Sequence, residues 1–281
     1  MHSASNIFTI LKQATEFLTS HNINEAKLDA EVLLCGVLNI TRSKLFTVRK
    51  EYISQQQYQQ YQSYLNRRIL REPVGYILGK TEFMGLNFKV NSNVLIPRQE
   101  TELIVENANK FIKENNFKTV LDLCTGSGAI AVSVAYYNNV FVVASDISNK
   151  ALQIAKDNAV TNNVSNKIEF MESDMFNNII SKKFDIIISN PPYVTTDEYI
   201  GLEKELFFEP KNAFVAGNDG LAFYRIIAQN AKQYLNDKGI LLLELNSNIS
   251  LQIADLFKDF YSVKTVKDYS DLDRILIVKN G

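Results

Sequence analysis

The residues with the clearest chemical potential lie in Phe184–Tyr193, which reads Phe-Asp-Ile-Ile-Ile-Ser-Asn-Pro-Pro-Tyr. The apolar run, rich in β-branched isoleucine, predicts a buried strand. Two prolines must end that strand, because proline cannot donate to a sheet ladder. The Asn-Pro-Pro-Tyr segment is therefore expected at the carboxyl end of a strand, where open α/β sheets bind their ligands.

The chemistry of this segment follows from its acceptors. The side-chain oxygen of Asn190 and the carbonyl of Pro191 both accept hydrogen bonds, and neither proline has an N–H to compete. Two neighbouring acceptors suit one planar –NH2 group, and the Tyr193 ring can stack on the π system behind it. We therefore predict that Asn190, Pro191 and Tyr193 act on an amide or an exocyclic amine. An ordinary strand-to-loop turn is the competing interpretation.

A glycine-rich turn, Asp122–Gly128, follows a predicted strand and opens a helix. Glycines at such a turn let the backbone approach a nucleotide or adenosyl cofactor and let the helix pack closely. The next strand ends at Asp146, 18 residues after Gly128, where a carboxylate can accept from both ribose hydroxyls. After the third strand, Asp174 could accept from an adenine amine, and Met175 could lie against the ring.

These groups together favour methyl transfer from S-adenosylmethionine. No general base, metal site or nucleophile is evident near the Asn-Pro-Pro-Tyr segment, and the only histidines are His2 and His21. The sulfonium donor is already activated, so alignment alone can supply much of the catalysis. Acceptors on both N–H bonds of an amide would orient it and stabilise the charge that develops during attack.

The periodicity of the chain predicts two kinds of structure. Apolar residues at helical spacing indicate a helical bundle over residues 6–72, and short extended pieces around Gly79 and Gly85 indicate a hairpin linker. From residue 119 strands and helices alternate, which predicts a doubly wound α/β sheet with an antiparallel pair at one edge. We expect strands at 119–123, 140–145, 167–171, 184–189, 240–245, 261–267 and 274–279, and helices at about 99–115, 128–137, 149–161, 220–235 and 249–258.

Composition places bounds on partners and location. Of the 281 residues 46% are hydrophobic, and the net charge is −1. Residues 1–80 carry a net +4 and the remainder a net −5, so nothing indicates direct binding of nucleic acid. Two cysteines, no signal-peptide pattern and no apolar run of about 20 residues predict a cytoplasmic protein that does not enter a membrane.

The motifs together make the chain similar to the PrmC/HemK family of protein-(glutamine-N5) methyltransferases, which act on peptide chain release factors. The resemblance covers essentially the whole length. It rests on the following segments: Arg71–Ile77, Ile96-Pro97-Arg98 with Glu100-Thr101-Glu102, Asp122–Gly128, Asn190–Tyr193, Phe208-Glu209-Pro210 and Asp273-Arg274. Asn-Pro-Pro-Tyr alone is shared with DNA and RNA amino-methyltransferases.

The resemblance implies a class I methyltransferase, a Rossmann-like fold with a seven-stranded sheet. It implies an N-terminal substrate-binding domain at 1–73, a hairpin linker at 74–93 and a catalytic domain at 94–281. We also expect a monomer. The resemblance implies S-adenosylmethionine, leaving as S-adenosylhomocysteine, at Cys124, Thr125, Gly126, Ser127, Gly128, Asp146, Met175 and Asn190, and the argument from the residues adds Asp174 to this set. The substrate glutamine, in the Gly-Gly-Gln motif of a class I release factor, would lie at Asn190, Pro191, Pro192 and Tyr193.

Three positions depart from the family pattern. Cys124 stands where glycine is common, so we expect an ordinary negative φ there. Phe207 replaces an arginine, and Leu245-Asn246 replaces the residues that follow a glutamate at the end of the fifth strand. Three other functions compete: glutamine methylation of a large-subunit ribosomal protein, adenine-amino methylation of nucleic acid, and a non-catalytic release-factor or ribosome-binding module. A nucleic-acid enzyme would need a basic groove.

Overall fold

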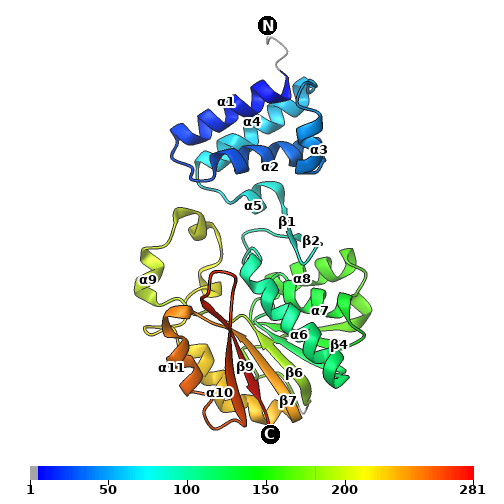
Figure 1. Cartoon of the computed structure of the whole chain (residues 1–281), viewed down its shortest axis with the longest axis vertical. Coiled ribbons are helices and arrows are strands. Elements are labelled where there is room, and N and C mark those ends of the chain that lie inside the picture. Colours follow the sequence, from blue (N-terminus) through cyan, green and yellow to red (C-terminus); the bar gives the residue numbers. More distant parts are fainter. Residues whose placement is uncertain (1–5, 181) are drawn as a thin grey trace. The chain divides into compact units, whose positions relative to one another are not determined.

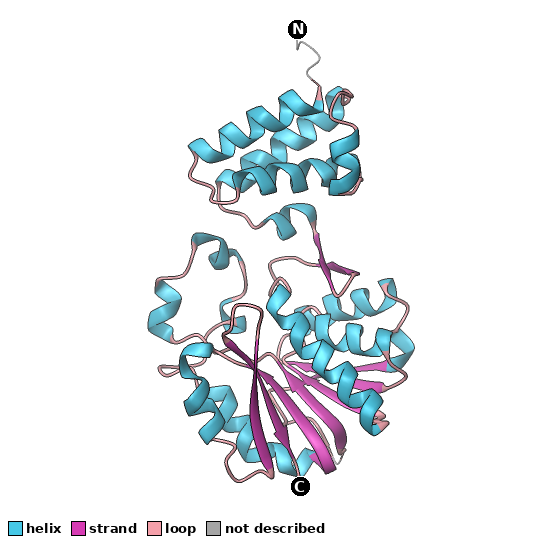
Figure 2. Ribbon diagram, in the orientation of Figure 1, coloured by secondary structure: helices cyan, strands magenta, loops and turns pink. Residues whose placement is uncertain are grey.

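The computed structural model describes residues 6–180 and 182–281, and these form two compact units (Figures 1 and 2). The helical unit runs through Gly79 and also contains Glu203–Phe208. The sheet unit comprises Lys80–Leu202 and Glu209–Gly281. Of the expected hairpin linker, the first part falls in the helical unit and the hairpin itself in the sheet unit. Within the described residues, no helix is both long and apolar enough to cross a membrane.

The helical unit confirms the helical prediction for the N-terminal region. Asn6, Thr41 and Ser54 cap three of its helices by accepting from backbone N–H groups, as short polar side chains at such positions do. Its core centres on buried Leu33 and Tyr61, whose hydroxyl donates to the Ala30 carbonyl at 2.8 Å. The helices are α1 (Ile7–Ser20), α2 (Ala26–Leu38), α3 (Arg42–Thr47), α4 (Gln55–Ile69) and α5 (Val74–Leu78).

A cluster of ion pairs in this unit includes a residue from far along the chain. Arg68 Nε lies 2.7 Å from an oxygen of Asp29, and Arg68 Nη1 lies 3.0 Å from Oε1 of Glu205. Arg71 reaches the same Glu205 oxygen at 3.3 Å. These charges are largely removed from water, so loss of any one partner would leave another charge buried without compensation and would destabilise the unit. The segment Glu203–Phe208, which contains the 3-10 helix η3 (Lys204–Phe208), is thereby held in the helical unit.

The sheet unit contains the predicted seven-stranded sheet, in the order β5-β4-β3-β6-β7-β9-β8. Strands β3 to β7 run parallel to one another, and β9 pairs antiparallel with both β7 and β8. The predicted antiparallel pair is confirmed, and β8 is the strand that forms the edge. The strands are β3 (Thr119–Leu123), β4 (Phe141–Asp146), β5 (Ile168–Glu172), β6 (Phe184–Ser189), β7 (Leu235–Glu244), β8 (Ser262–Lys267) and β9 (Asp273–Lys279).

Helices cover both faces of this sheet, as Figure 2 shows. Along β3, Val120 packs in one core with α6, α7 and α8, whereas Leu121 packs in the other with α10 and α11. This alternation follows from the two-residue period of a strand. The α-helices that cover the sheet are α6 (Glu102–Asn115), α7 (Ala129–Tyr137), α8 (Asn149–Thr161), α10 (Ala222–Tyr234) and α11 (Ser250–Asp255), and the short helix α9 (Thr196–Ile200) contributes no buried residue.

The register aligns the carboxyl ends of the central strands. Leu123 at the end of β3 pairs with Ser145 of β4 and with Ser189 of β6, and Ser189 pairs in turn with Leu243 of β7. The residues that follow these four strands therefore meet at one edge of the sheet. The hairpin of β1 (Lys80–Phe83) and β2 (Leu86–Lys89) precedes the sheet in the chain.

Candidate active site

The turn after β3 has three residues with left-handed backbone. Cys124 has φ 60°, so the prediction of a negative φ at that position was wrong. The turn is fixed by hydrogen bonds to β4, since Thr125 N donates to Ser145 O at 2.9 Å and Gly126 N donates to Asp146 Oδ2 at 2.8 Å. These bonds hold Cys124 in a conformation that costs a residue with a Cβ about 1–2 kcal/mol.

Gly126 and Gly128 serve different purposes in this turn. At Gly126, φ is 55° and no atom lies within 4 Å of the position a Cβ would take. At Gly128, φ is 80° and a Cβ would lie 2.9 Å from Cβ of Ala155. Gly126 therefore faces open space, whereas Gly128 lets α7 and α8 approach each other.

Two other residues of the turn have structural contacts. The Thr125 hydroxyl donates to Asp122 Oδ2 at 2.6 Å, and the Ser127 carbonyl accepts from Asn158 Nδ2 at 2.8 Å. Both residues are buried. Thr125, Ser127 and Gly128 line neither of the two cavities described below, whereas Cys124 and Gly126 line the larger one.

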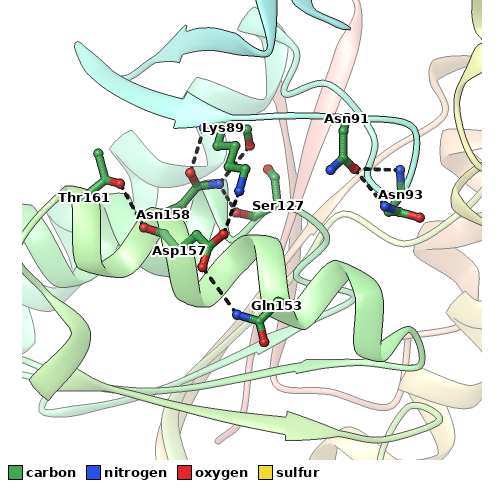
Figure 3. A network of polar contacts seen from close by, with 8 residues as sticks. All are labelled: Lys89, Asn91, Asn93, Ser127, Gln153, Asp157, Asn158 and Thr161. Atoms are coloured by element: carbon green, nitrogen blue, oxygen red, sulfur yellow. Dashed lines mark hydrogen bonds and ion pairs between the residues drawn. The ribbon is translucent and has the colours of Figure 1, made fainter.

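Asn158 on α8 joins this turn to the hairpin, as Figure 3 shows. Its amide oxygen accepts from Lys89 N at 2.7 Å, and its amide nitrogen donates to Lys89 O at 3.0 Å and to Ser127 O. Lys89 Nζ also pairs with Asp157 at 2.8 Å. Asn158 is fully buried, so this side chain fixes the end of β2 against the glycine-rich turn. The chain that leaves β2 then reaches Asn93, which lines the larger cavity.

The larger cavity has a volume of about 260 Å³ and lies at the carboxyl ends of β3, β4 and β6. That volume is near the lower end of the range of small-molecule sites, roughly 300–1,000 Å³. Of the residues predicted from the sequence, it brings together Cys124, Gly126, Asp146, Asp174, Met175, Asn190 and Pro192. Its other walls are mainly apolar, from residues that include Val94, Ile147, Val215 and Phe223.

Asp146 anchors one wall of this cavity. Its two oxygens accept from the backbone N–H groups of Gly126 at 2.8 Å and of Ser148 at 2.9 Å. Burial raises the pKa of Asp146 above its usual value, and the backbone hydrogen bonds oppose that rise. Each carboxylate oxygen has a second acceptor direction. The N-cap of α8 is Ser148, whose side chain accepts from Ala151 N, so Asp146 is not the residue that caps this helix.

A smaller cavity of about 50 Å³ adjoins the Asn-Pro-Pro-Tyr segment. Asn190, Pro191 and Tyr193 line it together with Arg98 and, from the end of β7, Glu244. Asn190 lines both cavities, as do Leu95 and Ala213, and it is the polar residue among these three.

Sequence reasoning missed the polar groups behind Asn190. The Asn190 amide nitrogen donates to Thr101 Oγ1 at 3.3 Å, and the Thr101 hydroxyl donates to Glu244 Oε2 at 2.7 Å. The Tyr193 hydroxyl lies 3.5 Å from Glu244 Oε1. Burial raises the pKa of Glu244 to about 7. Burial and the neighbouring Glu244 carboxylate together hold the pKa of Tyr193 well above its usual value. Glu244 is therefore a titratable group near the segment that the sequence analysis did not identify.

Arg98 is held by a second buried carboxylate. Its Nη2 lies 2.6 Å from Glu209 Oε1, and the other Glu209 oxygen accepts from Ile96 N at 2.9 Å. The Glu209 side chain is 1% exposed. This pairing fixes the loop that carries Arg98 beside the smaller cavity. Among the described residues, no group of three or more His, Cys, Asp or Glu is arranged to hold a metal ion.

Two family models match the chain. The PrmC N-terminal domain matches residues 9–79, and the methyltransferase small domain matches residues 99–217. The release factor glutamine methyltransferase of Clostridium acetobutylicum is 39% identical over 90% of this chain and 91% of its own length. The chain belongs to the release factor glutamine methyltransferase family. A second member, from Buchnera aphidicola subsp. Schizaphis graminum, is 40% identical over 96% of this chain and 98% of its own length.

Solved structures agree on the fold of this family member. The T. thermophilus 16S rRNA N2 G1207 methyltransferase, in complex with AdoMet and guanosine, has a TM-score of 0.54 at 18% identity, covering 72% of this chain and 50% of its own. A methyltransferase from Pyrococcus furiosus has a TM-score of 0.52 at 22% identity, covering 78% and 99%. The chain thus has the class I methyltransferase fold, as predicted.

Proposed function

We propose that this enzyme transfers a methyl group from S-adenosylmethionine to the side-chain amide nitrogen of the glutamine in the Gly-Gly-Gln motif of class I peptide chain release factors. The observation that carries the proposal is the place of Asn190, at the junction of a larger cavity suited to a cofactor and a smaller one lined by Pro191 and Tyr193. The curated relatives, named for release factor glutamine methylation, support the choice of substrate.

The residues of the larger cavity fit S-adenosylmethionine. Gly126 leaves open the space that a Cβ would occupy, so a ligand can lie against the backbone there. Asp146 offers acceptors for ribose hydroxyls, Asp174 an acceptor for an adenine amine, and Met175 an apolar surface for a flat ring. When bound, the cofactor supplies a methyl group on a positively charged sulfur.

The smaller cavity fits a carboxamide. Asn190 Oδ1 and the Pro191 carbonyl would accept one N–H each from the substrate –NH2, with Pro192 and Tyr193 beside them. An amide nitrogen is a weak nucleophile, because its lone pair is delocalised into the carbonyl. Two acceptors on its N–H bonds stabilise the positive charge that grows on nitrogen as it attacks, and they need no reorganisation during the reaction.

Mass spectrometry of a release factor after incubation with the enzyme and S-adenosylmethionine tests the proposal. We expect one added methyl group, located on the glutamine of Gly-Gly-Gln. Labelling of a large-subunit ribosomal protein without labelling of release factors would establish the first competing function. Methyl incorporation into bare nucleic acid would establish the second, against which the net charge of −5 outside residues 1–80 argues. Absence of cofactor binding in a calorimetric titration would indicate a non-catalytic module.

The remaining parts of the proposal concern the protein partner. The helical unit would bind the release factor away from the methylated glutamine, and the enzyme would act as a cytoplasmic monomer. Light scattering of the enzyme with and without a release factor would test both the oligomeric state and the complex.

A further inference from the structure

Three polar side chains from distant parts of the chain form one hydrogen-bonded series at the active site. Glu244 ends β7, Thr101 ends the 3-10 helix η1 (Gln99–Thr101), and Asn190 follows β6. Thr101 and Glu244 are 4% and 2% exposed, so water contributes little to this series. The links are Asn190 Nδ2 to Thr101 Oγ1 at 3.3 Å and Thr101 Oγ1 to Glu244 Oε2 at 2.7 Å.

The direction of each bond in this series follows from the number of protons available. An ionised carboxylate only accepts, so the single hydroxyl proton of Thr101 is donated to Glu244. Thr101 Oγ1 can then only accept from Asn190, and this selects the –NH2 side of the amide for that contact. In the described part of the chain, Asn190 Oδ1 receives no hydrogen bond, which leaves this acceptor for a ligand.

We propose that ionised Glu244, acting through Thr101, is a positioning residue that fixes which way the Asn190 amide faces, so that an acceptor rather than a donor meets the substrate –NH2. The inference deepens the proposed function and rests on it. An Asn190 amide turned the other way would place its own –NH2 against the –NH2 of the glutamine, and donor would face donor.

Protonation of Glu244 removes the constraint. A neutral carboxyl can donate to Thr101 Oγ1, which frees the threonine proton for Asn190 Oδ1 and allows the amide to turn. Because burial raises the pKa of Glu244 to about 7, this change falls within the pH range in which enzymes are assayed. Several other groups surround Glu244. Tyr224 of α10 donates a hydrogen bond from its hydroxyl to the Glu244 backbone carbonyl. The others are Thr101 and Glu100 from η1, Tyr193 after β6, Arg274 of β9, and Arg98, which lines the smaller cavity with Glu244.

The first test is a pH profile of kcat/KM on a release factor. We expect the wild type to rise with a midpoint of about 7 and to level above it. Glu244→Gln should lower kcat/KM at pH 8.5 by roughly 10- to 100-fold, the worth of a hydrogen bond to a charged group, and should abolish the rising limb. The affinity for S-adenosylmethionine, measured by calorimetry, should stay within about 2-fold, since Glu244 does not line the larger cavity.

Variants of Thr101 separate positioning from direct proton transfer. Thr101→Val should lose both activity and the rising limb, and Thr101→Ser should recover most of what the valine variant loses. If Thr101→Val keeps the limb, Glu244 acts on the substrate directly and the inference is overturned. Glu169→Gln, a glutamate of β5 that lines neither cavity, is the matched control and should change neither rate nor limb.

A readout without turnover distinguishes this inference from the proposed function. The side-chain 15N–1H2 resonances of Asn190 should shift with a midpoint near pH 7 in the wild type and not in Glu244→Gln. A release factor that is not methylated by the wild type would remove the proposed function. If the wild type methylates the release factor but the Asn190 resonances show the same pH dependence in the wild type and in Glu244→Gln, only the positioning role is refuted.

Discussion

Replacing each of the two glycines of the turn after β3 by alanine should separate cofactor binding from stability. At Gly128 a methyl group would lie 2.9 Å from Cβ and 3.1 Å from Cα of Ala155, with φ at 80°. Left-handed backbone costs about 1–2 kcal/mol and overpacking about 1–3 kcal/mol, so we expect a loss of about 3 kcal/mol. At Gly126, φ is 55° and no atom is near, so only the backbone term of about 1 kcal/mol remains.

The assay is thermal unfolding without ligand, followed by calorimetric titration with S-adenosylmethionine. For a domain of roughly 150–250 residues, 1 kcal/mol shifts Tm by about 2–4 °C. Gly128→Ala should therefore lower Tm by about 6–12 °C and Gly126→Ala by about 2–4 °C. Affinity should follow the opposite order, with Gly126→Ala weakened by about 10-fold or more, because its methyl group enters the larger cavity. A lower Tm for Gly126→Ala than for Gly128→Ala, or unchanged affinity in Gly126→Ala, would refute the division of roles.

Three further predictions concern single side chains. Asn190→Ala should abolish methylation while circular dichroism shows an intact fold; near-normal methylation would contradict the role of its acceptor. Glu209→Gln should lower the free energy of unfolding by about 2–4 kcal/mol, because a neutral amide at this buried position no longer balances the positive charge of Arg98. An unchanged Tm would show that the ion pair is dispensable for stability. Burial raises the pKa of Asp122 to about 7, so its folded form binds the proton more tightly than its unfolded form, and stability from this group falls as pH rises from about 4 to about 7. The Tm of Asp122→Asn minus the Tm of the wild type should therefore increase from pH 5 to pH 8. A difference that stays constant with pH would show that Asp122 titrates normally.

Local patterns predicted most of the fold. The strand at Phe184–Ser189 has the bounds expected, and the antiparallel pair near the C-terminus is present. Such features depend on periodicity and on turn residues within a few positions of each other. β7 instead begins at Leu235, earlier than expected, because Leu235 pairs with Phe184 of β6 and a register shift, which includes Lys238 with φ 61°, separates this pair from the pair of Ile240 with Ile186.

The missed parts of the site depend on contacts between distant positions. Thr101 and Glu244 are 143 residues apart, and no local pattern indicates their hydrogen bond. A signal was present, since Glu244 is an acidic residue that closes an otherwise apolar strand end, where burial without a partner would be unfavourable. The backbone of Cys124 could not be read from residue type, because hydrogen bonds to β4 override the preference of a non-glycine residue.

The membership of Glu203–Phe208 in the helical unit has a consequence for protein engineering. Cutting the chain after Gly79 would not release two self-sufficient pieces, because Glu205 would lose the guanidinium groups of Arg68 and Arg71. Exchange of N-terminal domains between homologous enzymes would require the segment Glu203–Phe208 to be exchanged together with them. A chimera that ignores it would carry a mismatched insert only a few positions before Glu209, the carboxylate that anchors Arg98.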